Sequence, residues 1–320
     1  MNGKMKILIA YDGSECADAA LDDLRRAGLP GAAEVLLVSV ADVFLPPPNE
    51  EGVDDTFPMY VPDGIRRAYE RAAKAVEKAR ELAERAAERV RKMFPGWDAR
   101  SDAYADSPAW AVIRTADEWQ PDLVIVGAQG HTVLGGRLIL GSVSQRVLYE
   151  ARCSVRVGRN PKSDADSPVR IIVGTDGSPD AEAAIEAVAA RSWPAGSEAR
   201  VVSVLDTVIC VTPDSSQPSE LKWVEAGEEE ESGWLRQRFE PAAGKLRQAG
   251  LNASVVMLNG NPKSVLIEEA EEWGADSIFL GAKGVRGIDR LLLGSVSAAV
   301  AARASCSVEI VRRALASADA

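Results

Sequence analysis

Two short acidic turns with matching residues are the first feature of the sequence that could do chemistry. Asp12-Gly13-Ser14 follows the apolar run KILIAY, and Asp176-Gly177-Ser178 follows RIIVGT. A carboxylate in such a turn can cap the next helix or accept hydrogen bonds from a ligand base or ribose. Because Ser or Asn would cap a helix equally well, capping alone remains an alternative interpretation of each turn.

A glycine-rich segment in the second half predicts an anion site. It has the spacing G-2x-G-9x-G-S, with glycines at Gly281, Gly284 and Gly294. Glycines let backbone N–H groups approach an anion, and the helix start at Gly294-Ser295 attracts phosphate. The same segment carries hydroxyl groups and cations, at Ser295, Ser297, Lys283, Arg286 and Arg290. A role as a turn alone would explain the glycines but not these cations.

The sequence repeats itself, and the repeat predicts the domain organisation. KILIAYDGSECADAAL at Lys6–Leu21 returns as RIIVGTDGSPDAEAAI at Arg170–Ile185, and ARCSVRV returns as ASCSVEI. A chain of 320 residues, at roughly 150 residues per domain, also favours two domains. The predicted domains are residues 1–160 and 168–314, and the polar segment Arg159–Ser167 is expected to join them as a short linker.

Short apolar runs alternate with longer helical patterns in each half, which predicts an α/β fold. Runs such as VLLVSV and SIFLG are apolar on both faces, as expected of strands between two helical layers. Each half is therefore predicted to be a doubly wound, Rossmann-like parallel sheet with five core strands. The expected strands are Lys6–Ala10, Glu34–Val40, Arg100–Tyr104, Leu123–Val126 and Ser154–Val157, then Arg170–Gly174, Ala199–Leu205, Ala253–Leu258, Ser277–Leu280 and Ser307–Val311.

The same pattern predicts where the helices and a ligand would lie. The longest helix is expected at Gly64–Phe94, and its counterpart at Ser232–Ala249 should be shorter or kinked because it contains Pro241 and Gly244. In an open parallel sheet, ligands bind beyond the carboxyl ends of the strands, where the strand order reverses. Both the acidic turns and the glycine segments follow strands that are expected to end there.

Composition excludes several classes of function. The 37 Lys and Arg against 48 Asp and Glu give a net charge of −11, so no nucleic-acid partner is expected. One histidine cannot supply a two-histidine metal site, and the four cysteines have no C-x-x-C spacing; no metal site is predicted. The apolar run at the start is too short for a signal peptide or a membrane span, so a cytoplasmic protein without a membrane partner is expected.

Both halves resemble the universal stress protein family, and the whole chain resembles a tandem member of it. The resemblance rests on the turns at Asp12 and Asp176, the G-2x-G-9x-G-S segment, and the Cys-x-Val strands at Cys153 and Cys306. It covers nearly the whole chain. It implies a universal stress protein-type fold, ATP as the ligand, and a sensor or regulator of the stress response rather than a dedicated enzyme. It leaves ADP, AMP and an accompanying Mg²⁺ open.

The resemblance also implies which residues hold the nucleotide. In the nucleotide-binding branch of the family, ATP is held by the aspartate after strand one, a valine at the end of strand two, and the glycine segment. The candidate residues of the second half are Asp176, Val204, Gly281, Lys283, Gly284, Arg286, Arg290, Gly294, Ser295, Val296 and Ser297. Those of the first half are Asp12, Val40, Gly127, Gly130, Gly141, Ser142 and Ser144.

The two halves differ in ways that predict a better nucleotide site in the second. The first glycine segment has ten residues rather than nine before Gly141, and Gln129 takes the place of Lys283. An extra residue shifts the backbone N–H groups that would hold phosphate. His131, the only histidine, has Val285 as its counterpart, so a phosphate-side or solvent-facing residue is favoured over a catalytic one.

Two other functions remain open at this point. One is a tandem interaction module that binds no nucleotide, and the other is a slow ATP-hydrolysing enzyme. An ATP-pyrophosphatase would need S-G-G-x-D-S after strand one, where this chain has YDGSEC and TDGSPD, and no catalytic residue is predicted. In family dimers the fifth strands meet edge to edge, which implies an internal pseudo-dimer through Val155 and Val157 with Val308 and Ile310. A further homodimer remains open.

Overall fold

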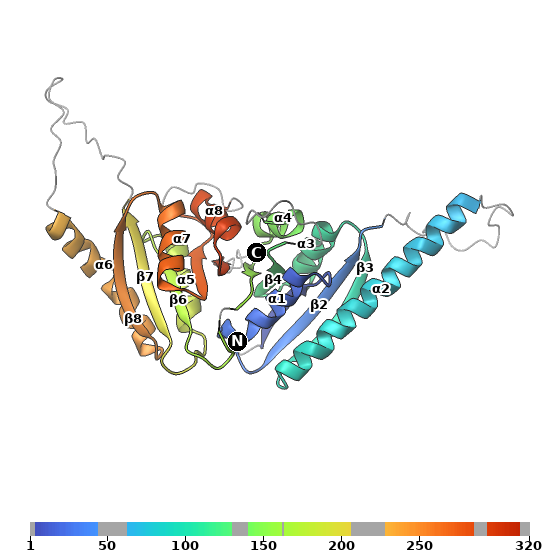
Figure 1. The fold of residues 1–320 in the computed structure, drawn as a ribbon, viewed down its shortest axis with the longest axis horizontal. Helices are drawn as coiled ribbons and strands as arrows, with labels where there is room; N and C mark the ends of the chain where they lie inside the picture. The colour runs from blue at the N-terminus through green and yellow to red at the C-terminus, as the bar shows by residue number, and fades with distance from the viewer. Residues whose placement is uncertain are drawn as a thin grey trace, which may run out of the picture. The chain divides into compact units, whose positions relative to one another are not determined.

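The computed structural model describes residues 4–43, 63–129, 140–161, 163–205, 228–284 and 293–313. The chain divides into two units, one of Met1–Arg25 with Leu29–Asn160 and the other of Arg26–Gly28 with Pro161–Ala320. Strands and helices alternate along both units (Figure 1). None of the helices in these described ranges is both long enough and apolar enough to cross a bilayer.

The first unit is built on five parallel strands. Its elements, in chain order, are β1 (Met5–Ala10), α1 (Glu15–Asp23), β2 (Ala33–Ala41), α2 (Asp63–Met93), β3 (Asp98–Ala105), α3 (Pro108–Trp119), β4 (Leu123–Gly127), α4 (Ser142–Glu150) and β5 (Ser154–Gly158), with the 3-10 turn η1 (Leu24–Arg26) after α1. The strand order is β3-β2-β1-β4-β5, and every neighbouring pair is parallel.

The second unit repeats this plan. Its elements are β6 (Arg170–Gly174), α5 (Pro179–Ala189), β7 (Glu198–Leu205), α6 (Glu228–Gln248), β8 (Asn252–Asn259), α7 (Pro262–Trp273), β9 (Ser277–Gly281), α8 (Ser295–Arg303) and β10 (Ser307–Val311). The order β8-β7-β6-β9-β10 is the same as in the first unit, again with parallel neighbours. The predicted fold, two repeated five-stranded doubly wound sheets, is confirmed.

Helices cover both faces of each sheet, which explains the strands' apolar composition. In the first unit, α1 and α2 lie against one face of the sheet, and α3 and α4 contact each other. The second unit has the corresponding pairs, α5 with α6 and α7 with α8. All of Ile7, Leu8 and Ile9 on β1 are buried, and every residue of β9 is buried. A strand enclosed on both faces must be apolar throughout, as the sequence predicted.

The two long helices differ as the sequence predicted. Helix α2 runs for 31 residues, whereas α6 runs for 21 and contains Pro241. The helix continues through this proline, so α6 is shorter than α2 without ending at Pro241. Its inner face still packs on the sheet through Phe239, Ala243 and Leu246, which are buried in the core of the second unit.

A repeated polar contact fixes the amino-terminal edge of each sheet. Asp122, before β4, accepts a hydrogen bond from the Lys6 backbone N–H at 2.7 Å, and Asp276, before β9, accepts one from Arg170 at 2.8 Å. The carbonyl oxygens of Trp119 and Trp273 accept bonds from the side chains of the same Lys and Arg. Both tryptophans therefore lie at the sheet edge opposite the acidic turns, where they join helix to sheet.

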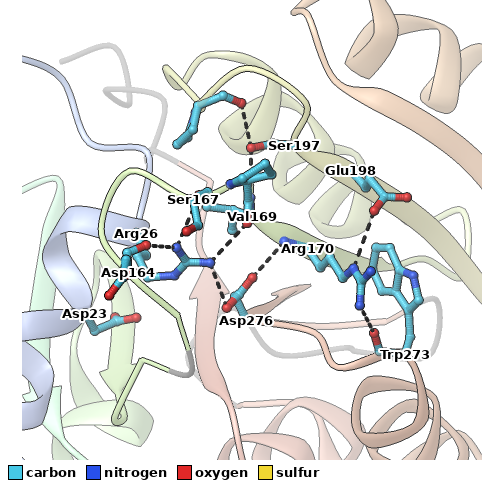
Figure 2. A network of polar contacts seen from close by, with 12 residues as sticks. Asp23, Arg26, Asp164, Ser167, Val169, Arg170, Ser197, Glu198, Trp273 and Asp276 are labelled. Atoms are coloured by element: carbon cyan, nitrogen blue, oxygen red, sulfur yellow. Dashed lines mark hydrogen bonds and ion pairs between the residues drawn. The ribbon is translucent and has the colours of Figure 1, made fainter.

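Residues 26–28 group with the second unit although they lie within the first sequence repeat. The Arg26 side chain, which is 2% exposed, donates hydrogen bonds to the carbonyl oxygens of Asp164 and Ser167 (Figure 2). Its Nη2 atom also lies 2.9 Å from the Asp276 carboxylate. Arg26 thus binds the segment that leads into β6. These contacts lie at the amino-terminal edge of the strands, opposite the edge where the acidic turns lie.

Candidate functional site

The point at which the strand order reverses lies between β6 and β9 in the second unit. The acidic turn follows β6 and the glycine segment follows β9, and these two strands are direct neighbours. The carboxyl ends of parallel neighbours share one edge of the sheet, so the two features are brought together there. The first unit repeats this arrangement with β1 and β4.

The acidic turn of the second unit is held by its own hydrogen bonds. The Ser178 N–H donates to Asp176 Oδ1 at 3.0 Å, and the Ser178 hydroxyl accepts from the Ala181 N–H at 3.2 Å. Ser178 therefore caps α5, and Asp176 closes the turn before it. Gly177 has φ +77°, a left-handed conformation that favours glycine. Asp176 is exposed at the end of the strand, and Ser178 rather than Asp176 caps the helix.

The glycine segment lies directly against this carboxylate. A Cβ atom on Gly284 would stand 2.5 Å from Asp176 Oδ2, closer than any ordinary contact. The hydroxyl of Ser178 also donates to the Lys283 carbonyl oxygen at 3.3 Å. A Cβ at residue 284 would therefore displace the Asp176 carboxylate, and glycine lets the loop after β9 lie directly against the acidic turn.

Two other glycine-segment residues make contacts that serve the fold itself. A Cβ on Gly281 would stand 2.4 Å from the Asp180 carbonyl carbon in α5, so glycine is required there for helix and strand to pack. Ser297 is buried and donates its hydroxyl hydrogen to the Gly281 carbonyl oxygen at 2.7 Å. These contacts position the start of α8 beside the end of β9. A ligand role for either residue stays a prediction.

The remaining candidates of the second unit surround the same edge. Gly294 donates its N–H to the Ala282 carbonyl oxygen at 2.8 Å, which brings the α8 start back to β9. Ser295 is exposed, and Val204, Lys283 and Val296 are half-buried. Arg286 and Arg290 lie outside the described residues. The structure therefore brings together Asp176, Lys283, Gly284, Gly294 and Ser295, and places Val204 at the end of the neighbouring strand β7.

The first unit repeats this construction with the same contacts. The Ser14 N–H donates to Asp12 Oδ1 at 3.0 Å, and Ser14 accepts from the Ala17 N–H at 3.2 Å. Ser144 donates to the Gly127 carbonyl oxygen at 2.6 Å, and the Gly141 N–H donates to the Ala128 carbonyl oxygen at 2.8 Å. Ser142 is exposed, Val40 is half-buried near the end of β2, and Gly130 and His131 lie outside the described residues.

The first unit adds a tyrosine to an ion-pair network that both units have, since Lys245 of α6 pairs with Glu182 and Glu186 of α5 in the second. The Tyr11 hydroxyl donates to Asp18 Oδ1 at 2.8 Å, and Arg89 of α2 reaches the same oxygen at 2.7 Å and Asp22 at 2.6 Å. Burial, followed by the hydrogen bond to Asp18, raises the pKa of Tyr11 to about 12. The second repeat has Thr175 at this position, whose hydroxyl instead accepts from the Gly177 N–H.

Sequence reasoning missed the side chain that the long helix places over each turn. A Cβ on Gly177 would stand 2.9 Å from Nη2 of Arg238 on α6, whereas a Cβ on Gly13 would stand 2.9 Å from Cδ2 of Leu82 on α2. The two helices align without a gap here, since Glu84 and Arg91 form the same ion pair as Glu240 and Arg247, and Leu82 corresponds to Arg238. The sequence does not show that this position faces the turn, because Arg238 is one of many charged residues of an amphipathic helix.

Comparison with known proteins agrees with this architecture. The sequence model of the universal stress protein family matches residues 4–159 and again residues 169–312. The chain belongs to the universal stress protein family. Two matches in one chain make it a tandem member, so the resemblance inferred from the sequence is confirmed.

Tandem relatives cover the whole of this universal stress protein. One from Mycolicibacterium smegmatis is 27% identical over 308 residues, which are 96% of each chain. Rv2005c of Mycobacterium tuberculosis is 26% identical and covers 96% of this chain and 97% of its own. A solved universal stress protein from Archaeoglobus fulgidus superposes with a TM-score of 0.60 at 20% identity, covering 97% of this chain and 98% of its own. This last likeness concerns the fold alone.

Proposed function

We propose that this protein binds an adenine nucleotide, ATP above all, at the carboxyl edge of the second sheet, and that it acts as a sensor or regulator in a stress response. The contact that carries the proposal is the approach of Gly284 to Asp176, where a Cβ would stand 2.5 Å from the carboxylate. This contact puts the loop after β9 beside the carboxylate that follows β6, where one small ligand can touch both. The adenine preference and the regulatory role come from the family resemblance.

The residues at this edge fit a nucleotide in their chemistry. The exposed carboxylate of Asp176 can accept hydrogen bonds from a ribose or a base. Lys283 is half-buried, and its positively charged amine can meet a phosphate group. The exposed Ser295 begins α8, whose N-terminus favours an anion. We propose Asp176, Val204, Lys283, Gly284, Gly294, Ser295 and Val296 as its ligand residues, with Gly281 and Ser297 shaping the site and Arg286 and Arg290 completing it.

The first domain is proposed to be the weaker site. Its turn has the same hydrogen bonds as the second, but Gln129 stands in place of Lys283. With one Lys or Arg in the glycine segment against three in the second, and a segment one residue longer, it should hold a polyphosphate less well. Asp12, Val40, Gly127, Gly130, Gly141, Ser142 and Ser144 are its candidate ligands. Domain boundaries of 1–160 and 168–314 are proposed for both functional units.

Thermal unfolding with and without nucleotide tests the proposal. Ligand that binds only the folded protein raises its stability by about 2.7 kcal/mol at one hundred times Kd. We expect 1 mM ATP, with Mg²⁺ and with EDTA in parallel, to raise the Tm by several degrees. An unchanged Tm with ATP, ADP and AMP, together with no nucleotide in an acid extract of the purified protein, would reject nucleotide binding and favour an interaction module.

A further inference from the structure

A cation of the long helix reaches the turn glycine of the second domain. The guanidinium of Arg238 on α6 packs against Gly177, with Nη2 2.9 Å and Cζ 3.5 Å from the position that a Gly177 Cβ would occupy. Arg238 is an exposed residue. Among the described residues it has a contact with the Phe239 ring, 5.7 Å from the centroid, but no hydrogen bond or ion pair. Its donors are therefore available to a ligand at the turn.

The first domain offers an internal comparison for this residue. The two turns have the same hydrogen bonds at the same lengths. The serine N–H lies 3.0 Å from the aspartate Oδ1 in both turns, and the serine hydroxyl accepts from the helix N–H at 3.2 Å in both. The side chain that reaches the turn from the long helix is the difference. Leu82 takes this position in the first domain, with Cδ2 2.9 Å from a Gly13 Cβ. Two nearly identical turns thus face an apolar group in one domain and a cation in the other.

We infer that Arg238 contacts the phosphate groups of the nucleotide in the second domain and makes affinity depend on their number. A guanidinium presents five N–H donors in a planar fork that matches phosphate oxygens. It would add a second cation to Lys283 in a chain whose net charge of −11 otherwise repels polyphosphates. This inference rests on the proposed function.

Affinities for a series of ligands test the inference on the full chain. Dissociation constants for ATP, ADP, AMP and adenosine are measured by calorimetry for the wild type, Arg238→Leu, which copies the first domain, and Arg238→Lys. We expect Arg238→Leu to weaken ATP binding about tenfold, ADP less, and adenosine less than twofold, because a charge-assisted hydrogen bond is lost only with phosphate. Arg238→Lys should keep part of the preference for ATP. Arg303→Leu, at an exposed arginine of α8, is the matched control and should leave all four constants unchanged.

Each other outcome has a definite meaning. If the wild type binds ATP and Arg238→Leu leaves the ratio of ATP to adenosine affinity unchanged, the inference is wrong while the proposed function stands. An equal loss for all four ligands would show stacking on the base rather than a phosphate contact, and would also overturn it. If the wild type binds none of the four, the proposed function fails and the inference fails with it. Circular dichroism of each variant checks that the sheet is retained.

Discussion

Replacement of Gly284 by alanine should separate ligand binding from folding. The added Cβ would stand 2.5 Å from Asp176 Oδ2, whereas ordinary contact begins at 3.4 Å, so the carboxylate or the loop must move by about 0.9 Å. That shift would also disturb the 3.0 Å hydrogen bond from Ser178 N to the same carboxylate. The perturbation thus falls on the residue that is proposed to hold the nucleotide.

The expected size of the effect follows from this geometry. A hydrogen bond to a charged group contributes about 1.5–3 kcal/mol. Because Asp176 is exposed, we take the lower value for the bond between its carboxylate and the nucleotide. Loss of that bond should raise the Kd for ATP about tenfold. Gly284 is exposed and its φ is not in the left-handed region, so the free energy of unfolding should change by less than about 1 kcal/mol.

Calorimetry with ATP and urea unfolding of the same samples measure the two quantities. The matched control is Gly244→Ala in α6, because a Cβ there meets nothing within 4 Å. It should leave Kd unchanged and stabilise the helix by about 0.5–1 kcal/mol. Wild-type affinity for ATP in Gly284→Ala would refute the reasoning, since the loop would then be structural only. A loss of affinity that is matched by a loss of folding would refute it too.

Three further predictions concern stability and activity. The pKa of Tyr11 is raised to about 12 from the usual 10, so the folded state favours the neutral phenol; its stabilising effect is complete below pH 10 and is lost as the pH rises toward 12. Because the phenol is only half-buried and solvent screens its contact with Asp18, we expect a loss of only about 1 kcal/mol, absent in Tyr11→Phe, when urea unfolding is compared at pH 9 and pH 11.5. Asp23→Asn should destabilise the first unit by about 3 kcal/mol, because it leaves the fully buried Arg156 without the carboxylate 2.6 Å away; an unchanged urea midpoint would contradict this. With saturating ATP, a phosphate-release assay should show far less than one turnover per minute, and many turnovers per minute would favour the enzymatic alternative.

The fold was accessible from the sequence because its determinants are local and repeated. Runs such as SIFLG are apolar at every position, and the structure buries β9 on both faces as that composition requires. The repeat of the Asp-Gly-Ser turns fixed where each copy begins, and the two family matches agree. Patterns of this kind depend only on neighbouring residues in the chain.

The candidate site was accessible only in part, because some of its contacts join distant segments. The glycine spacing marked Gly284, but not that its Cα lies against Asp176, 108 positions earlier in the sequence. Nor did the sequence distinguish Gly281, whose Cβ would meet the backbone of α5, from Gly284, whose Cβ would meet the side chain of Asp176. Arg238 and Leu82 were missed for the same reason, since helix register over a turn depends on tertiary packing rather than on a motif.

The stoichiometry of ATP binding tests the central claim most directly. Nucleotide-free protein, prepared by unfolding and refolding, is titrated with ATP in a calorimeter, with the second-domain variant Gly284→Ala beside it. We predict nearer one than two ATP molecules per chain, and an about tenfold higher Kd for that event in the variant. No heat with ATP in the wild type, or one event that keeps its wild-type Kd in Gly284→Ala and disappears in a variant of Asp12, would contradict the assignment of the nucleotide to the second domain.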